Sequence, residues 1–210
     1  MRVSIRRYHL DCFLKRLQLN GKVLDIAGKK VNKRGEFIPN ESGCTEWCYL
    51  NIEEASKPDI IASFDALPIK SNYYDNALLI EAIEYAEFPD TVLKEIYRIL
   101  TPGGKIIIST PLFCAIHNDN YDRARYTKYE IERKLSKANF SNILINKNGS
   151  LFSCTFDFIT TYLTRSNPKI YKKIIKRIIL SEYFMNFIIY LDNIADIDSI
   201  TTGYTITAVK

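Results

Sequence analysis

The sequence predicts an α/β protein built on a parallel sheet that is covered on both faces. The chain has 210 residues, of which 47% are hydrophobic and 25% charged, enough for one compact domain with a real core. Short apolar runs alternate with helical spacings or loops through residue 145. This alternation is typical of a parallel sheet, whose strands bind ligands at their carboxyl ends.

Seven short segments have the composition of strands. Most are continuous apolar runs, as expected for strands that are buried on both faces, and the last one alternates. They are Lys22–Ile26, Trp47–Ile52, Asp59–Ala62, Asn76–Ile80, Lys105–Ser109, Ile143–Ile145 and Tyr204–Val209.

The predicted helices fill most of the remaining chain. Residues 7–19 have apolar residues at helical spacing, and Asn20-Gly21 is expected to end that helix. Pro89 opens a second helix, which the turn at residues 101–104 ends. The Thr127–Glu130 segment fits a capping box that begins a third.

The two remaining long segments differ in kind. Glycine and proline punctuate residues 28–46, so we expect a long loop there, and loops of this length are usually functional. Residues 152–193 are predicted to be mostly helical. We therefore expect a single domain over residues 1–210, divided as follows: an N-terminal helix at 1–20, a core at 21–150, a helical insertion at 151–199 and a last strand at 200–210.

Composition excludes several classes of function. A net charge of +5 is too small to argue for a nucleic-acid partner. The N-terminus lacks the charge-free apolar core of a signal peptide, and no apolar run approaches a membrane span, so we expect a cytoplasmic protein. The five cysteines have no zinc-ligand spacing; we expect free thiols and no metal site.

Polar side chains follow the first four predicted strands. Asp25 precedes Ala27 and Gly28, whose small size would let a ligand approach the backbone. Asn51 ends the second strand and Asp65 follows the third; for Asp25 and for Asp65 an ordinary turn residue is the alternative. Glu81 and Glu84 follow the fourth strand, where a solvated pair is an alternative to a ligand site.

These motifs together resemble class I S-adenosylmethionine-dependent methyltransferases. The resemblance runs over residues 22–145 and the last strand, and rests on KVLDIAG, CYLNI, SFDALPI, NALLIEAIEY and LKEIYRILTPGGKIIISTP. It implies S-adenosylmethionine as cofactor and a Rossmann-like, seven-stranded sheet in which the last strand is antiparallel and lies beside the sixth.

The resemblance also implies roles for single residues. The following would bind the cofactor: Asp25, Ala27 and Gly28 at the methionine moiety, Asn51 where the family has an acid on the ribose, Asp65, Ala66 and Leu67 at the adenine, and Glu81 near the methionine end. The glycine-rich loop of the family is replaced by Ala-Gly-Lys-Lys. Lys29 or Lys30 there would pair with the cofactor's carboxylate or stay solvated.

The segment from His117 to Thr127 is similar to a loop in a subgroup linked to surface-glycan or lipopolysaccharide biosynthesis. Because it follows the fifth strand, we expect the acceptor to bind there. The candidate catalytic residues are His117 as a base, Asp122 as its partner or substitute, Arg123 and Arg125 for a phosphate or carboxylate, and Tyr126 for stacking on a sugar. A purely structural His117 is the alternative.

A basic amphipathic segment precedes the last strand. Residues 158–181 contain no acidic residue and six basic ones, and an apolar stripe continues to residue 191. Residues 168–191 therefore fit an anionic membrane surface on the inner face, or a helix that packs on the sheet with a solvated basic side.

The sequence thus predicts direct methyl transfer to a hydroxyl of a glycan, nucleotide-sugar or lipid-linked precursor, without metal. A catalytically inactive scaffold in a membrane-associated glycan-assembly complex is the alternative, because the glycine-rich loop is altered. A nicotinamide dehydrogenase is disfavoured, since no Gly-x-Gly-x-x-Gly follows the first strand.

Overall fold

A seven-stranded sheet forms the centre of the protein in a computed structural model, which describes residues 4–31, 35, 37–39, 43–116, 120–165, 181–195 and 197–210. The strands follow the order β3-β2-β1-β4-β5-β7-β6. Their bounds are β1 Gly21–Ile26, β2 Cys44–Asn51, β3 Ile60–Ile61, β4 Tyr74–Ile80, β5 Leu100–Pro111, β6 Ser141–Lys147 and β7 Gly203–Val209. Only β7 runs against the others, and it lies between β5 and β6. The predicted α/β fold and strand arrangement are confirmed.

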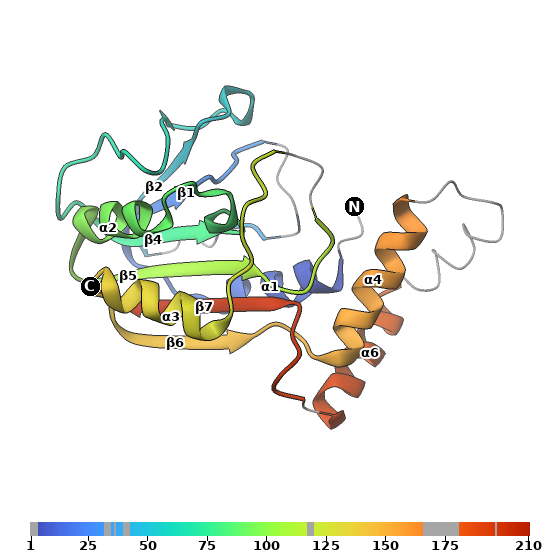
Figure 1. Ribbon diagram of the computed structural model, residues 1–210. Helices are drawn as coiled ribbons and strands as arrows, with labels where there is room; N and C mark the ends of the chain where they lie inside the picture. The colour runs from blue at the N-terminus through green and yellow to red at the C-terminus, as the bar shows by residue number, and fades with distance from the viewer. Residues whose placement is uncertain are drawn as a thin grey trace.

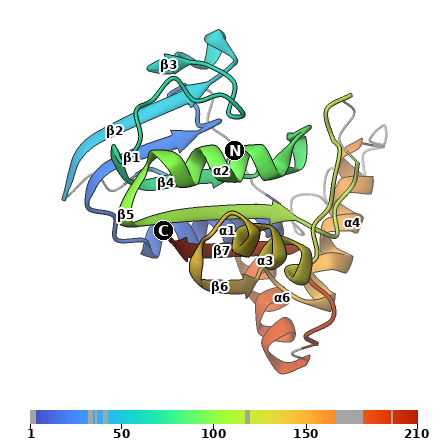
Figure 2. The same cartoon turned by 60° about the vertical axis from the view of Figure 1, so that its left-hand side comes forward.

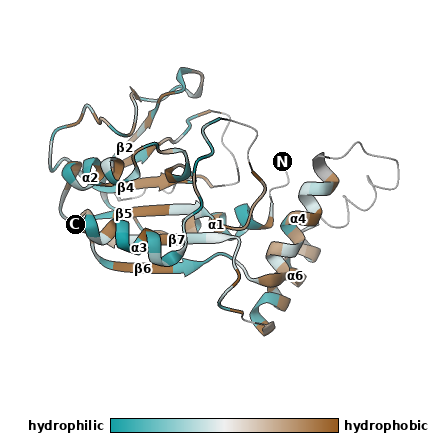
Figure 3. Cartoon of the chain, in the orientation of Figure 1, coloured by the Kyte–Doolittle hydropathy of each residue, from teal (hydrophilic) through white to brown (hydrophobic). Residues whose placement is uncertain are grey.

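Helices cover both faces of the sheet (Figure 2). The helical elements are α1 Ile5–Arg16, η1 Glu54–Ser56, η2 Ile83–Tyr85, α2 Pro89–Ile99, α3 Lys128–Lys137, α4 Leu151–Arg165 and α6 Glu182–Ala195. Apolar side chains of α2 and α3 pack on one face, and α1 with the turn after it packs on the other. The brown colour along β4 and β5 in Figure 3 marks the core between these layers.

The helices α4 and α6 form a separate layer beyond the carboxyl ends of the strands (Figure 1). They pack on each other and, through Phe156, Met185 and Ile188, on Ile5 of α1. Within the described residues no helix is long and apolar enough to cross a membrane. Most of the basic residues in the predicted amphipathic segment lie outside the described residues. The division of the chain into four parts stays a prediction.

Two boundaries differ from their predictions. The first helix ends at Arg16, and Leu17 already has an extended backbone. Gly21 instead begins β1 at a φ of 75°, close to the Asp75 carboxylate, which accepts from the N–H of Lys22 at 2.8 Å. The turn predicted at residues 101–104 lies inside β5 as an irregularity, because Leu100 and Lys105 pair with Tyr74 and Asn76 on β4.

The capping box is confirmed in part. The Thr127 hydroxyl accepts from the N–H of Glu130 at the start of α3. The Glu130 carboxylate, however, pairs with Arg133 one turn further along. The N-terminus of α3 therefore keeps its hydroxyl cap, and the acidic side chain supports the outer face of the helix.

Candidate active site at the carboxyl ends of the strands

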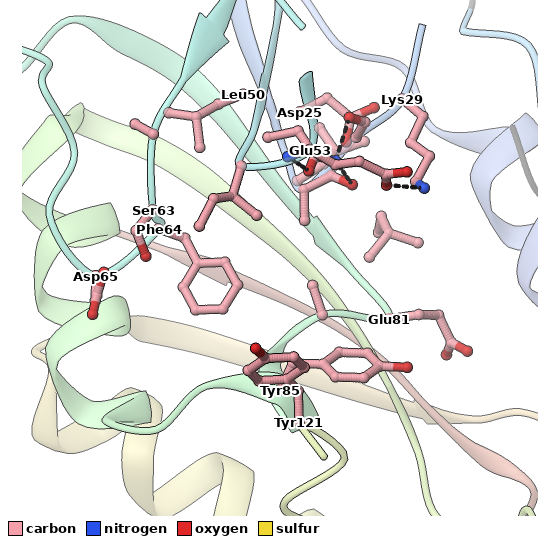
Figure 4. A pocket seen from close by; sticks show the side chains of 18 of the residues that line it. Asp25, Lys29, Leu50, Glu53, Ser63, Phe64, Asp65, Glu81, Tyr85 and Tyr121 are labelled. Atoms are coloured by element: carbon pink, nitrogen blue, oxygen red, sulfur yellow. Dashed lines mark hydrogen bonds and ion pairs between the residues drawn. The ribbon is translucent and has the colours of Figure 1, made fainter. Parts of the chain in front are cut away.

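A cavity of about 720 Å³ opens where β1, β2 and β4 end (Figure 4). Its volume lies in the usual range for pockets that enclose a small ligand, roughly 300–1,000 Å³. The sticks in Figure 4 place Asp25, Lys29 and Glu53 at one end, Phe64 in the middle, and Tyr85 and Tyr121 at the other end. The cavity is therefore not filled by its own side chains and has room for a nucleoside.

Asp25 and Gly28 are placed by a tight turn after β1. Asp25 pairs in register with Tyr49 and Leu78 on the neighbouring strands, and Ala27 has a φ of 60°. A Cβ atom on Gly28 would lie 2.4 Å from the carboxyl carbon of Asp25, so only glycine leaves this carboxylate in place. The turn after β1 thus sets an acid at the cavity wall.

Asn51 serves this turn rather than an open ligand position. Its amide nitrogen donates to the carbonyl oxygens of Ala27 at 2.9 Å and Gly28 at 3.0 Å. Its oxygen accepts from the N–H of Glu53 at 2.9 Å, and the residue is 7% exposed. A carboxylate could not donate these two hydrogen bonds, which accounts for the amide in place of an acid. Asn51 also lines the cavity, and its predicted role on a ribose stays a prediction.

Glu53, two residues after Asn51, brings a carboxylate to the cavity. The Glu53 side chain lines the cavity, is 52% exposed and forms an ion pair with Lys29, which lines it too. Lys30 pairs with Asp59 instead. Both lysines of the altered loop are therefore engaged by acids of the chain itself, and neither is simply solvated.

The Asp65 segment is held by α2. Phe64 and Asp65 line the cavity, whereas Leu67 is 4% exposed and lies in the core, and Ala66 is exposed outside the lining. Arg98 donates to the carbonyl oxygens of Leu67 and Ile69 at 3.0 and 2.7 Å. Leu67, which was predicted beside the adenine, does not line the cavity because the chain turns inward immediately after Asp65, whereas Phe64 does line it.

Glu81 and Glu84 have different surroundings. Glu81 lines the cavity at a φ of 52°, its N–H donates to the Ser109 hydroxyl at 3.0 Å, and its carboxylate forms an ion pair with Arg6. Glu84 is 1% exposed, and neither carboxyl oxygen has a hydrogen-bond partner among the described residues. Burial raises the pKa of Glu84 to about 7, against the opposing effect of Arg6 and Arg125. The two acids are therefore not a solvated pair.

Of the residues predicted on the acceptor loop, the structure brings only Arg123 to the cavity within the described part of the chain. Tyr121 and Arg123 line the cavity, while the Asp122 side chain is 2% exposed and forms an ion pair with Arg125. Tyr126 is 6% exposed in the core. The N–H groups of Arg123 and Ala124 both donate to the carbonyl of Glu84, which fixes the path of the loop so that Asp122 faces inward. The predicted catalytic roles of Asp122, Arg125 and Tyr126 do not fit this placement, and His117 lies outside the described residues.

Several lining residues were not predicted. Arg7 comes from α1, Phe37 from the loop between β1 and β2, and Tyr85 from η2. Tyr85 belongs to the quoted NALLIEAIEY motif, so its position after β4 was a usable signal. Among the residues that the structure describes, no group of three or more His, Cys, Asp or Glu side chains is arranged to hold a metal ion.

Comparison with known proteins identifies the class. Residues 16–108 match the family model described as a methyltransferase domain. The sterol 4-C-methyltransferase strm-1 of Caenorhabditis elegans is 30% identical over 122 residues, which are 57% of this chain and 35% of that protein. The ubiquinone/menaquinone biosynthesis C-methyltransferase UbiE of Neisseria gonorrhoeae is 28% identical over 114 residues, 48% of this chain and 46% of that one. The chain thus spans less than half the length of these relatives.

Solved structures share the fold over nearly the whole chain. A SAM-dependent methyltransferase from Archaeoglobus fulgidus has a TM-score of 0.58 at 17% identity, covering 97% of this chain and 94% of that one. A Haemonchus contortus phosphoethanolamine N-methyltransferase, solved with S-adenosylhomocysteine, has a TM-score of 0.56 at 14% identity and covers 98% and 52%.

The fold is the one that these solved S-adenosylmethionine-dependent methyltransferases share, and residues 16–108 match a methyltransferase domain, as the sequence motifs indicated. The comparisons do not support the finer resemblance to a surface-glycan subgroup, since these relatives are named for sterols and quinones.

Proposed function

We propose that the protein transfers a methyl group from S-adenosylmethionine to a hydroxyl of a sugar-containing small molecule: a glycan, a nucleotide-sugar or a lipid-linked precursor. The observation that carries the proposal is a single cavity with two chemically different ends. Figure 4 shows Asp25 and Glu53 on one side of the cavity and the rings of Tyr85 and Tyr121 on the other, and Arg123 also lines the cavity. A donor and an acceptor would thus meet in one enclosed space, and alignment is most of what this reaction requires.

The cofactor end offers a partner for each polar part of the donor. We propose that Asp25 accepts from the ammonium group, Glu53 from the ribose hydroxyls and Asp65 from the exocyclic amine of adenine, with Phe64 packed on the ring. Bound S-adenosylmethionine supplies a methyl group already activated by its sulfonium. The remaining work of the chain is to orient the acceptor, exclude water and remove one proton.

The acceptor end combines aromatic and charged groups. The side chains of Tyr85 and Tyr121 both line the cavity (Figure 4), and either ring offers a face on which a sugar ring can stack. Arg123, which pairs with Glu87 at 3.3 Å, can hold a phosphate or carboxylate on the acceptor. His117 remains our expected base.

A lipid-like acceptor is the second candidate, favoured by the names of the relatives. Exposed apolar and aromatic side chains also lie on α4 and α6: Phe158, Ile159, Tyr162, Tyr183, Phe187, Tyr190 and Ile194. With the basic residues between these helices, they support our proposal that this cytoplasmic enzyme contacts an anionic membrane through residues 168–191. Flotation with anionic vesicles at low salt tests this contact, and failure to float refutes it.

Two measurements test the function. Isothermal titration with S-adenosylhomocysteine is expected to give micromolar or tighter binding, and no binding by the folded protein would favour the inactive scaffold. Methyl transfer to sugar-containing and quinol acceptors then separates the two substrate classes. In the active reaction Tyr121→Ala is expected to raise the acceptor KM with little change in cofactor affinity. Tyr129→Ala, at an exposed tyrosine outside the cavity, is the matched control.

A further inference from the structure

We infer that Arg7 of α1 binds the carboxylate of the cofactor's amino-acid end, opposite Asp25, so that the two side chains form one site for an amino-acid zwitterion. The inference rests on the proposed cofactor site and assigns a residue that none of the strand-end motifs contains. Arg7 and Asp25 line the same cavity, although 17 intervening residues separate α1's Arg7 from Asp25 at the end of β1.

Local structure holds Arg7 at the cavity wall. The Ser4 hydroxyl caps α1 and accepts from the backbone N–H of Arg7 at 3.2 Å. One helical turn later, the carboxylate of Asp11 approaches the Nε atom at 2.9 Å, and the side chains of Arg7 and Asp11 are 19% and 5% exposed. The position of the guanidinium is thus set before any ligand binds.

The long loop after β1 leaves room for this guanidinium. Gly35 has a φ of 85°, and a Cβ atom there would lie 2.1 Å from the Nε atom of Arg7. Gly28 makes the same allowance for the carboxylate of Asp25. The missing side chains of Gly28 and Gly35 therefore leave space for the carboxylate of Asp25 and the guanidinium of Arg7 at the same cavity.

The ion pair with Asp11 uses only one corner of the Arg7 guanidinium. Nε lies near Asp11 but has no aligned hydrogen bond with the residues that the structure describes, and a guanidinium carries four N–H donors besides this one. Burial lowers the pKa of Arg7, while Asp11 and Asp25 oppose that effect. A ligand carboxylate would add the compensation that a desolvated cation requires.

The other two cations that line the cavity each form an ion pair with a neighbouring acid. Lys29 pairs with Glu53, and Arg123 pairs with Glu87, which lines the cavity as well. Lys30 pairs with Asp59. The altered glycine-rich loop thus supplies no uncommitted lysine, and Arg7 lies close enough to Asp25 for the two charges to interact.

Titration with S-adenosylmethionine and with its decarboxylated form tests the inference, since the two ligands differ only in the carboxylate. Arg7→Gln is expected to weaken S-adenosylmethionine by roughly ten- to a hundred-fold and to leave the decarboxylated ligand within about two-fold. Asp25→Asn, the matched control, should weaken both ligands because both keep the ammonium group. Arg7→Lys should restore part of the lost affinity.

The outcomes separate the two proposals. Equal weakening of both ligands by Arg7→Gln, or weakening of neither, overturns the assignment of Arg7 while the cofactor site stands. A wild-type protein that binds neither ligand refutes the cofactor site and the assignment together. If Arg7→Gln lowers the melting temperature markedly, the comparison is made with Arg7→Lys, whose smaller loss must still be confined to S-adenosylmethionine.

Discussion

Replacing Gly28 by alanine tests how the turn after β1 builds the cofactor site. The new Cβ atom would lie 2.4 Å from the carboxyl carbon of Asp25 and 2.5 and 2.7 Å from its two oxygens. Gly28 does not have the positive φ that excludes other residues, so its backbone accepts alanine. The strain is therefore relieved by movement of the Asp25 side chain, and the fold is expected to survive.

The expected cost falls on cofactor binding. Losing one hydrogen bond between charged groups costs about 1.5–3 kcal/mol, which corresponds to roughly a ten- to hundred-fold weaker Kd. Isothermal titration with S-adenosylhomocysteine measures this loss. Thermal melting, which should change by only a few degrees, shows that the variant is folded.

A double-mutant cycle separates the proposed cause from a direct clash with the ligand. In an Asp25→Ala background the obstructing carboxylate is gone, so Gly28→Ala should cause little further loss. If the two substitutions weaken binding additively, the alanine acts on the ligand itself and our account of the turn is wrong. An unchanged Kd in the single variant would refute it as well.

Two further predictions concern stability. Asn51→Asp removes both donations to the turn carbonyls of Ala27 and Gly28 and is expected to lower the melting temperature by roughly 4–10 °C, whereas an unchanged melting curve would mean that these bonds contribute nothing. Glu84→Gln should gain stability relative to wild type as pH rises from 5 to 8. Because burial raises the pKa of Glu84 from 4.5 to about 7, the folded state keeps a proton that the unfolded chain releases, and wild-type stability falls by up to about 1.4 kcal/mol per pH unit. Urea unfolding at several pH values measures the difference, which a pH-independent offset would contradict.

The sheet and part of the site follow from local sequence. Asp25, Asp65 and Glu81 were found because apolar runs mark the strands, and polar residues that follow parallel strands meet at one edge. The order of the strands came from the family resemblance, since periodicity does not say which strands pair. The prediction that Asn20-Gly21 ends the first helix was wrong. Glycine is needed at position 21 because the carboxylate of Asp75, a residue far along the chain, lies against it.

The remaining site residues depend on contacts that no local pattern records. Arg7 lies on a helix whose spacing marks only its apolar side, and its place at the cavity depends on how α1 packs on the sheet. Asp122 and Tyr126 were chosen by residue type, but the loop path, fixed by the carbonyl of Glu84, turns both inward. In the sequence, Asn51 stands as a substitute for an acid. In the structure its amide nitrogen donates to the carbonyl oxygens of the turn after β1, a role that the sequence did not reveal.

The position of β7 bears on how the protein is made. Since β7 separates β5 from β6, the outer strand has no neighbour until residues 203–209 leave the ribosome. In a nascent chain shorter than this, β6 has no strand to pair with and the open side of β5 is exposed, whereas α3 can already be held by the ion pairs of Lys134 and Lys137 with Asp90 of α2. Assembly of this half of the molecule therefore waits for the end of β7, and a stalled translation product would be a target for chaperones.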